Sequence, residues 1–90
     1  MLSAPNRVGD SRMSFFMVGK YEVRAWEFGA SGPNGYRVNG RWSITDPAVS
    51  DEPILEDECP IERSTVGEGV NDAMKAGREA AEALVAKDES

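Results

Sequence analysis

The chain has 90 residues, a net charge of −6 at neutral pH, one cysteine and no histidine. This length fits a single small domain, and the lone Cys59 excludes the secreted class that depends on internal disulfides. Without histidine the usual general base near neutral pH is missing, as are Ser–His and Cys–His pairs. No apolar run is long enough to span a membrane. We therefore expect a cytoplasmic protein that is not an enzyme and uses no cofactor or metal.

The first segments of the chain divide into a polar lead-in and an extended strand. Residues 1–13 are polar and interrupted by Pro5 and Gly9, which predicts a disordered lead-in. A single domain is expected over 14–87, followed by a frayed tail at 88–90. Aromatic and β-branched residues favour a strand over 14–28, with Gly19 as a bend. Its inward-facing set is then odd-numbered: Phe15, Met17, Tyr21, Val23 and Ala25.

A second strand follows a glycine-rich turn. Residues 29–35 carry Pro33 and Gly35 at positions typical of a β-turn. Residues 36–45 then alternate with a period of two, which predicts a strand whose core face is Tyr36, Val38, Trp42 and Ile44. Any hairpin register in which the paired residue numbers sum to an odd value places both apolar sets on one sheet face.

The rest of the chain predicts a short edge strand and one helix. Residues 48–64 are acidic and irregular except for 53–56, where Pro53 restricts a third strand to a sheet edge or to its first residue. Thr65 and Glu68 have the spacing of a capping box. Helical spacing then predicts a helix over about 66–87 with an apolar face formed by Val70, Met74, Gly77, Ala81 and Leu84. The expected fold class is α+β, a three-stranded antiparallel sheet (β-β-β-α) with one C-terminal helix packed on one face.

Small residues on the helix have two possible uses. Ala73, Gly77 and Ala81 form a row that would let the helix approach a sheet carrying Trp and Tyr closely. Three further alanines widen the apolar stripe beyond what three strands can cover: Ala76, Ala80 and Ala83. A helix-mediated homodimer would use this surplus, although tolerance of alanine on a surface helix explains it equally well.

Three motifs outside the main strands carry residue types that can do chemistry. Cys59 lies among acidic residues, which raise a thiol pKa and so make it unreactive. The acidic residues of 51–58 lack the spacing and turn glycine of an EF-hand loop, so we interpret them as a solvated loop. Gly67 and Gly69 sit at the predicted helix start, where backbone amides can bind an anion, but Glu62 and Glu68 would repel one.

The outer face of the predicted hairpin is the candidate binding surface. Three arginines and two large aromatic residues share it with an asparagine: Arg24, Trp26, Phe28, Arg37, Asn39 and Arg41. Trp26 should lie beside Arg37 or Arg41, within cation–π reach. Such a face is typical of protein interfaces and also of stacking platforms for single-stranded nucleic acid. The third interpretation is a solvated face on which Glu22 and Glu27 pair with the arginines.

The order of elements carries a resemblance. The segments YEVRAWEF and GYRVNGRWSIT followed by the helix NDAMKAGREAAEAL resemble short uncharacterised bacterial proteins with an antiparallel sheet and one C-terminal helix. This resemblance implies a fold and no activity. The order is also similar to double-stranded RNA-binding domains, but here the helix starts with Glu68 and Asp72 instead of basic residues. The sequence therefore predicts a small protein-interaction module, binding through the outer sheet face or the helix, with single-stranded nucleic-acid binding as the alternative.

Overall fold

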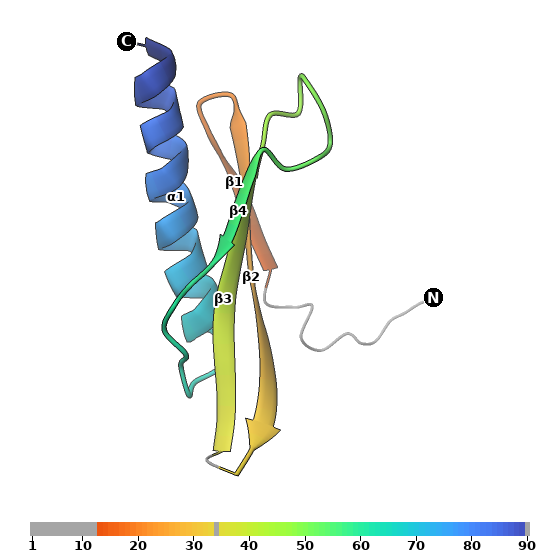
Figure 1. Ribbon diagram of the computed structural model, residues 1–90, viewed down its shortest axis with the longest axis vertical. Coiled ribbons are helices and arrows are strands. Elements are labelled where there is room, and N and C mark those ends of the chain that lie inside the picture. The colour runs from red at the N-terminus through yellow and green to blue at the C-terminus, as the bar shows by residue number, and fades with distance from the viewer. Residues whose placement is uncertain (1–12, 34, 90) are drawn as a thin grey trace.

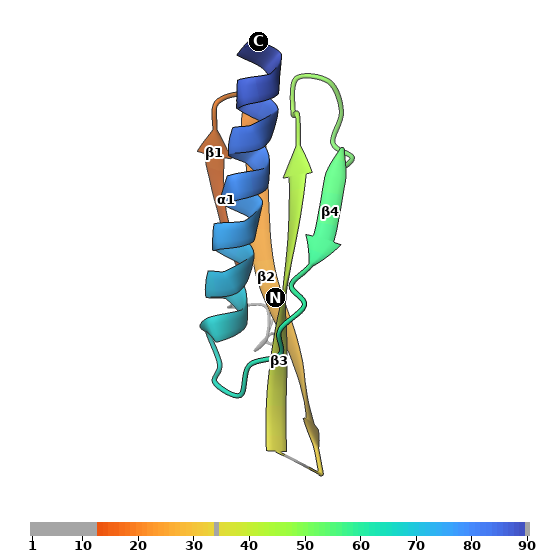
Figure 2. The same cartoon turned by 60° about the vertical axis from the view of Figure 1, so that its left-hand side comes forward.

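The computed structural model describes residues 13–33 and 35–89 as one sheet covered on one side by a helix (Figure 1). The elements are β1 (Met13–Val18), β2 (Tyr21–Gly32), β3 (Gly35–Thr45), β4 (Leu55–Glu58) and α1 (Glu68–Glu89). The strands pair antiparallel in the order β1-β2-β3-β4, so β1 and β4 are the two edges (Figure 2). The predicted α+β class is confirmed, but the sheet has four strands where the sequence predicted three. The predicted lead-in at 1–13 falls outside the described residues except for Met13, which begins β1.

The additional strand arises because the chain reverses at Gly19 and Lys20, where the sequence predicted only a bend. Gly19 has a φ of 60°, and the turn is closed by the pair Val18 and Tyr21. A positive φ at the first position of a two-residue hairpin loop favours glycine. The reversal also changes which side chains of β1 face the helix. Phe16 and Val18 pack against the core, whereas Phe15 and Met17 were wrongly predicted to do so and are 70 % and 57 % exposed.

The predicted hairpin of β2 and β3 is confirmed in its register. The pairs run from Glu22 with Thr45 to Gly32 with Gly35, so every pair of numbers has an odd sum. The hairpin extends further than predicted, since 29–32 belong to β2 and not to a turn. As a result the end of the hairpin projects beyond the helix (Figure 1).

The core side of the hairpin contains most of the residues predicted for it. Val38, Trp42 and Ile44 are buried, with relative exposures of 1 %, 8 % and 0 %. Tyr36 is the exception, because it lies on the projecting part of the hairpin and is 41 % exposed. Its ring lies across Gly29, where an added Cβ would be 2.6 Å from the Tyr36 hydroxyl oxygen. Tyr36 therefore packs on the neighbouring strand and not under α1.

The predicted third strand is β4, displaced by two residues toward the C-terminus. It occupies an edge, as expected, and pairs with Arg41–Ile44 of β3. The connection from β4 to α1 continues along the edge of β3. The Cys59 amide donates to the Gly40 carbonyl at 2.8 Å, and Val38 and Arg63 exchange two backbone hydrogen bonds. This part of the edge of β3 is thus closed by the chain itself.

Small residues bring α1 into close contact with the sheet, as predicted. The helix residues Gly69, Ala73, Gly77 and Ala81 are all buried. A Cβ on Gly77 would lie 2.7 Å from a methyl group of Val23 and 3.3 Å from the Cβ of Trp42. Larger residues in this row would push the helix away from the sheet.

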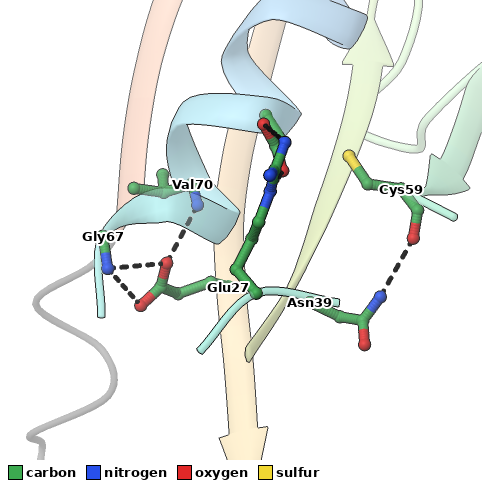
Figure 3. A network of polar contacts seen from close by, with 7 residues as sticks. Glu27, Asn39, Cys59, Gly67 and Val70 are labelled. Carbon is green, nitrogen blue, oxygen red and sulfur yellow. Dashed lines mark hydrogen bonds and ion pairs between the residues drawn. The ribbon is translucent and has the colours of Figure 1, made fainter. Parts of the chain in front are cut away.

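Both ends of α1 are fixed by side chains from β2. At the start of the helix, the carboxylate of Glu27 accepts hydrogen bonds from the amides of Gly67 (2.9 Å) and Val70 (2.9 Å) (Figure 3). At the other end, the Tyr21 hydroxyl donates to the carboxylate of Asp88. This contact explains why the helix runs to Glu89, where the sequence predicted fraying from residue 88.

Candidate binding surface on the open sheet face

The sheet face opposite α1, here called the outer face, holds the six residues that the sequence predicted for binding. In the β2–β3 ladder Trp26 is paired with Arg41, and Phe28 is paired with Asn39. Directly paired residues point to the same side of a sheet, as do residues two apart on one strand. Arg24 and Arg37 therefore share this face with them. The arrangement predicted for these six residues is present in the structure.

Strand β1 adds an apolar border that the sequence analysis missed. Met13, Phe15 and Met17 lie on the outer face with exposures of 52 %, 70 % and 57 %. Met13 is paired with Trp26, so the exposed side chains of β1 lie on the strand next to Trp26 and Phe28. We call Met13, Phe15, Met17, Trp26 and Phe28 the apolar strip. The Gly19-Lys20 pair was the signal that could have revealed it, because a reversal there exchanges the two faces of β1.

Arg24 and Arg41 on the outer face have acidic partners. The Arg24 Nε lies 3.5 Å from a carboxylate oxygen of Glu22, and an Arg41 nitrogen lies 3.9 Å from Glu58. The pairing of Glu22 with an arginine was one of the sequence interpretations and is confirmed. The same interpretation was wrong for Glu27, which lies on the helix side and caps α1. In each pair the arginine side chain is 40–50 % exposed, so solvent screens the attraction and the pairs contribute little to stability.

The outer face changes in character from one edge of the sheet to the other. Its β1 side is apolar, its centre on β2 and β3 is basic, and its β4 side carries Glu56 and Glu58. The residue pairs place Met13, Trp26, Arg41 and Glu58 in one row across the four strands. A ligand lying along the basic centre would meet carboxylates on one side and apolar side chains on the other.

Asn39 has a structural role as well as a place on this surface. Its side-chain amide donates to the Cys59 carbonyl at 2.9 Å, which holds the connection between β4 and α1 (Figure 3). A ligand would have to compete with this hydrogen bond. We therefore regard Asn39 as the least available of the six predicted binding residues.

The cation–π contact predicted at Trp26 is not among those formed by the described residues. Such contacts occur instead at two other places: Arg78 lies 4.6 Å from the ring centre of Phe16, and Lys20 lies 5.5 Å from that of Tyr21. The Phe16 contact covers the helix side of β1 near the edge of the sheet.

Cys59 is buried, with an exposure of 6 %. Burial is the main cause that raises the pKa of its thiol, and the carboxylates of Asp72 and Asp57 add to the effect. The direction agrees with the sequence analysis, which considered only the acidic neighbours. A protonated, covered thiol is a poor nucleophile.

At the start of the helix, where the sequence argued against the binding of an external anion, the amides bind a carboxylate of the protein itself. The amides of Gly67 and Val70 bind the carboxylate of Glu27, which is 7 % exposed. These two amides already donate to a carboxylate from β2, so they are not available to an external anion.

The alanine surplus on α1 is smaller than the sequence suggested. Ala76 and Ala80 are half-buried and pack against the core, and Ala83 is exposed. The fourth strand widens the sheet beyond the three that were predicted. A helix-mediated homodimer stays a prediction, with less apolar area available to it.

Comparison of the chain with protein-family models, with curated proteins and with solved structures found no match. Within residues 13–33 and 35–89, no helix is both long and apolar enough to cross a membrane. The site must therefore be interpreted from its own geometry.

Proposed function

We propose that this chain is a small protein-interaction module that binds a partner protein through the outer face of its sheet. The observation that carries the proposal is the apolar strip, whose members Phe15, Met17 and Phe28 are 70 %, 57 % and 48 % exposed on one face. Contiguous apolar patches of this kind are typical of interaction sites in soluble proteins. Aromatic residues, methionine and arginine, which make up much of this face, are also the residue types enriched in protein interfaces.

The surroundings of the strip favour a protein partner over a nucleic acid. Arg24 and Arg41 each have a carboxylate nearby, and Glu56 and Glu58 border the basic centre. Those carboxylates and the net charge of −6 would repel a phosphate backbone. A protein surface with its own apolar side chains could cover the apolar strip. Its charged side chains could pair both with the basic centre and with the carboxylates on the β4 side.

Single-stranded nucleic acid is the second candidate, favoured by Trp26 and Phe28 beside the three arginines of the outer face. Bases stack on exposed aromatic rings, and arginines bind the backbone. In this case an oligonucleotide should quench Trp26 fluorescence, and rising salt should weaken the affinity steeply. For a protein partner, oligonucleotide should leave the fluorescence unchanged even at low salt.

The proposal is tested by affinity capture from the cells that make the protein, with the wild-type chain and two variants as bait. Trp26→Ala removes the centre of the apolar strip. Val49→Ala is the matched control, since Val49 is 76 % exposed in the loop between β3 and β4. A specific partner should be captured by the wild type and by Val49→Ala and lost with Trp26→Ala. If all three folded baits captured the partner equally, binding would not involve Trp26 and the proposed site would be wrong.

A further inference from the structure

The two edges of the sheet differ sharply in charge. Strand β4, at one edge, reads LEDE and carries three carboxylates among its four residues. Strand β1, at the other edge, reads MSFFMV and has no charged residue and no proline. Charges and prolines on an edge strand prevent it from pairing with other chains. β4 is therefore protected against pairing, and β1 is not.

The geometry of the turn at Gly19 shows which backbone groups of β1 point away from the sheet. In an antiparallel pair, residues that exchange hydrogen bonds alternate with residues that do not. The pair Val18 and Tyr21 closes a two-residue turn, and such a closing pair is hydrogen-bonded. Alternation makes Phe16 the next hydrogen-bonded residue. The N–H and C=O groups of Phe15 and Met17 consequently point to the free edge, where no other segment of residues 13–33 and 35–89 pairs with them.

The chemistry of this edge defines its occupant. Unpaired backbone groups in a row accept another extended strand, and an uncharged apolar edge favours an uncharged apolar strand beside it. β1 itself meets these requirements. Two antiparallel copies of β1 related by a twofold axis near Phe15 would place Phe15 opposite its own copy and Met13 opposite Met17 of the second chain.

Charge and shape make β1 the place where a second copy can pair with the least repulsion. A chain with a net charge of −6 repels its own copy, so contact is least costly where charges are absent. Pairing through β1 directs the acidic β4 edges of the two molecules to opposite ends of the combined sheet. The helix leaves the edge accessible, since α1 packs mainly against β2 and β3.

We infer that the chain forms a homodimer by antiparallel pairing of β1 with β1 of a second copy, which joins the two sheets into one. The dimer brings two apolar strips side by side on a continuous outer face. The inference does not depend on the proposed function, because it concerns the backbone edge and would stand if the outer face bound nothing.

Two variants at one position test the backbone pairing. Phe15→Pro removes an amide that points to the free edge but leaves the ladder with β2 intact, and proline is tolerated on strand edges. Phe15→Val is the matched control, which keeps the amide and an apolar β-branched side chain. In light scattering the wild type and Phe15→Val should be dimers, whereas folded Phe15→Pro should have its dimer Kd raised about tenfold or more.

Amide hydrogen exchange of the wild type gives a second test that does not require any variant to fold. The amides of Phe15 and Met17 should become protected as protein concentration rises, and those of Phe16 and Val18 should be protected at all concentrations. The inference is overturned if the wild type is monomeric at about 1 mM, where even a millimolar Kd would populate the dimer. It is equally overturned if a dimer forms with these two amides unprotected or persists unchanged in folded Phe15→Pro.

Discussion

The carbonyl oxygen of Gly69 lies 2.1 Å from the position that a Cβ on Gly40 would occupy. The backbone of the helix start therefore rests directly on the backbone of β3. Any side chain at residue 40 must displace the helix or the strand, since a carbonyl oxygen cannot rotate away as the end of a flexible side chain can. This contact fixes how closely the first turn of α1 approaches the sheet.

Gly40→Ala is accordingly expected to be among the most damaging small substitutions in the chain. Overpacking typically costs about 1–3 kcal/mol of the free energy of unfolding, and a clash with backbone should reach or exceed the upper end. Gly32→Ala is the matched control, since its Cβ would meet nothing closer than 4.0 Å. Urea denaturation should show a large loss for the first variant and a change within about 0.5 kcal/mol for the second. Equal stability of the two variants would contradict the close contact.

Glu27 provides a second test of how the helix start is held. Its carboxylate accepts hydrogen bonds from Gly67 and Val70 while almost entirely buried. Loss of a helix cap typically costs about 0.5–2 kcal/mol, and Glu27→Ala should lie at the upper end because it leaves buried amides without acceptors. Glu27→Gln keeps one acceptor oxygen and should lose less. Guanidinium denaturation of both variants measures the difference, and a neutral Glu27→Ala would show that the cap is unimportant.

The contact between Tyr21 and Asp88 predicts a loss of stability at high pH. The hydrogen bond to Asp88 is the main cause that raises the pKa of Tyr21 to about 12, with burial and the charges of Asp88 and Asp46 adding to it. Folding thus favours the protonated phenol. The stabilisation is complete below the ordinary tyrosine pKa of about 10 and disappears as pH rises toward 12.

Absorbance titration of the phenolate checks this prediction. Asp88→Asn should lower the pKa of Tyr21 toward its ordinary value, because it removes the carboxylate that accepts the hydrogen bond from the hydroxyl. Tyr21→Phe should show a smaller decline of unfolding free energy between about pH 10 and 12 than the wild type. If Asp88→Asn left the titration unchanged, the helix end would not be held by this hydrogen bond.

The β2–β3 hairpin could be predicted because two independent patterns had to agree. Val23 and Ala25 on one strand and Trp42 and Ile44 on the other can share a buried face in only one class of register. The row of small helix residues was equally informative, since aromatic side chains on the sheet required a close approach. Both features depend on burial, and buried apolar or small residues recur in the sequence with the period of a strand or a helix.

Two features were not predicted, the orientation of β1 and the capping role of Glu27, because the sequence pattern for each is weak. The segment FFMV in β1 is apolar at every position, so alternation cannot show which side chains face the core. Only the turn decides this, and a glycine inside an apolar segment fits a bend as well as a reversal. Glu27 was misplaced because its capping partners lie 40 and 43 residues away in the chain. Its odd residue number was the available signal. The odd-numbered residues of β2 face the helix, so a charged residue among them indicated a buried polar contact.

Fluorescence of Trp26 is the most direct measure of the proposed binding through the outer face. The chain has two tryptophans, and Trp42→Phe leaves Trp26 as the sole reporter once circular dichroism shows that the variant is folded. Addition of the captured, purified partner should shift the Trp26 emission to the blue, because the indole moves from a half-exposed position into an interface. A partner that binds by an independent assay without changing Trp26 emission would contradict the proposal.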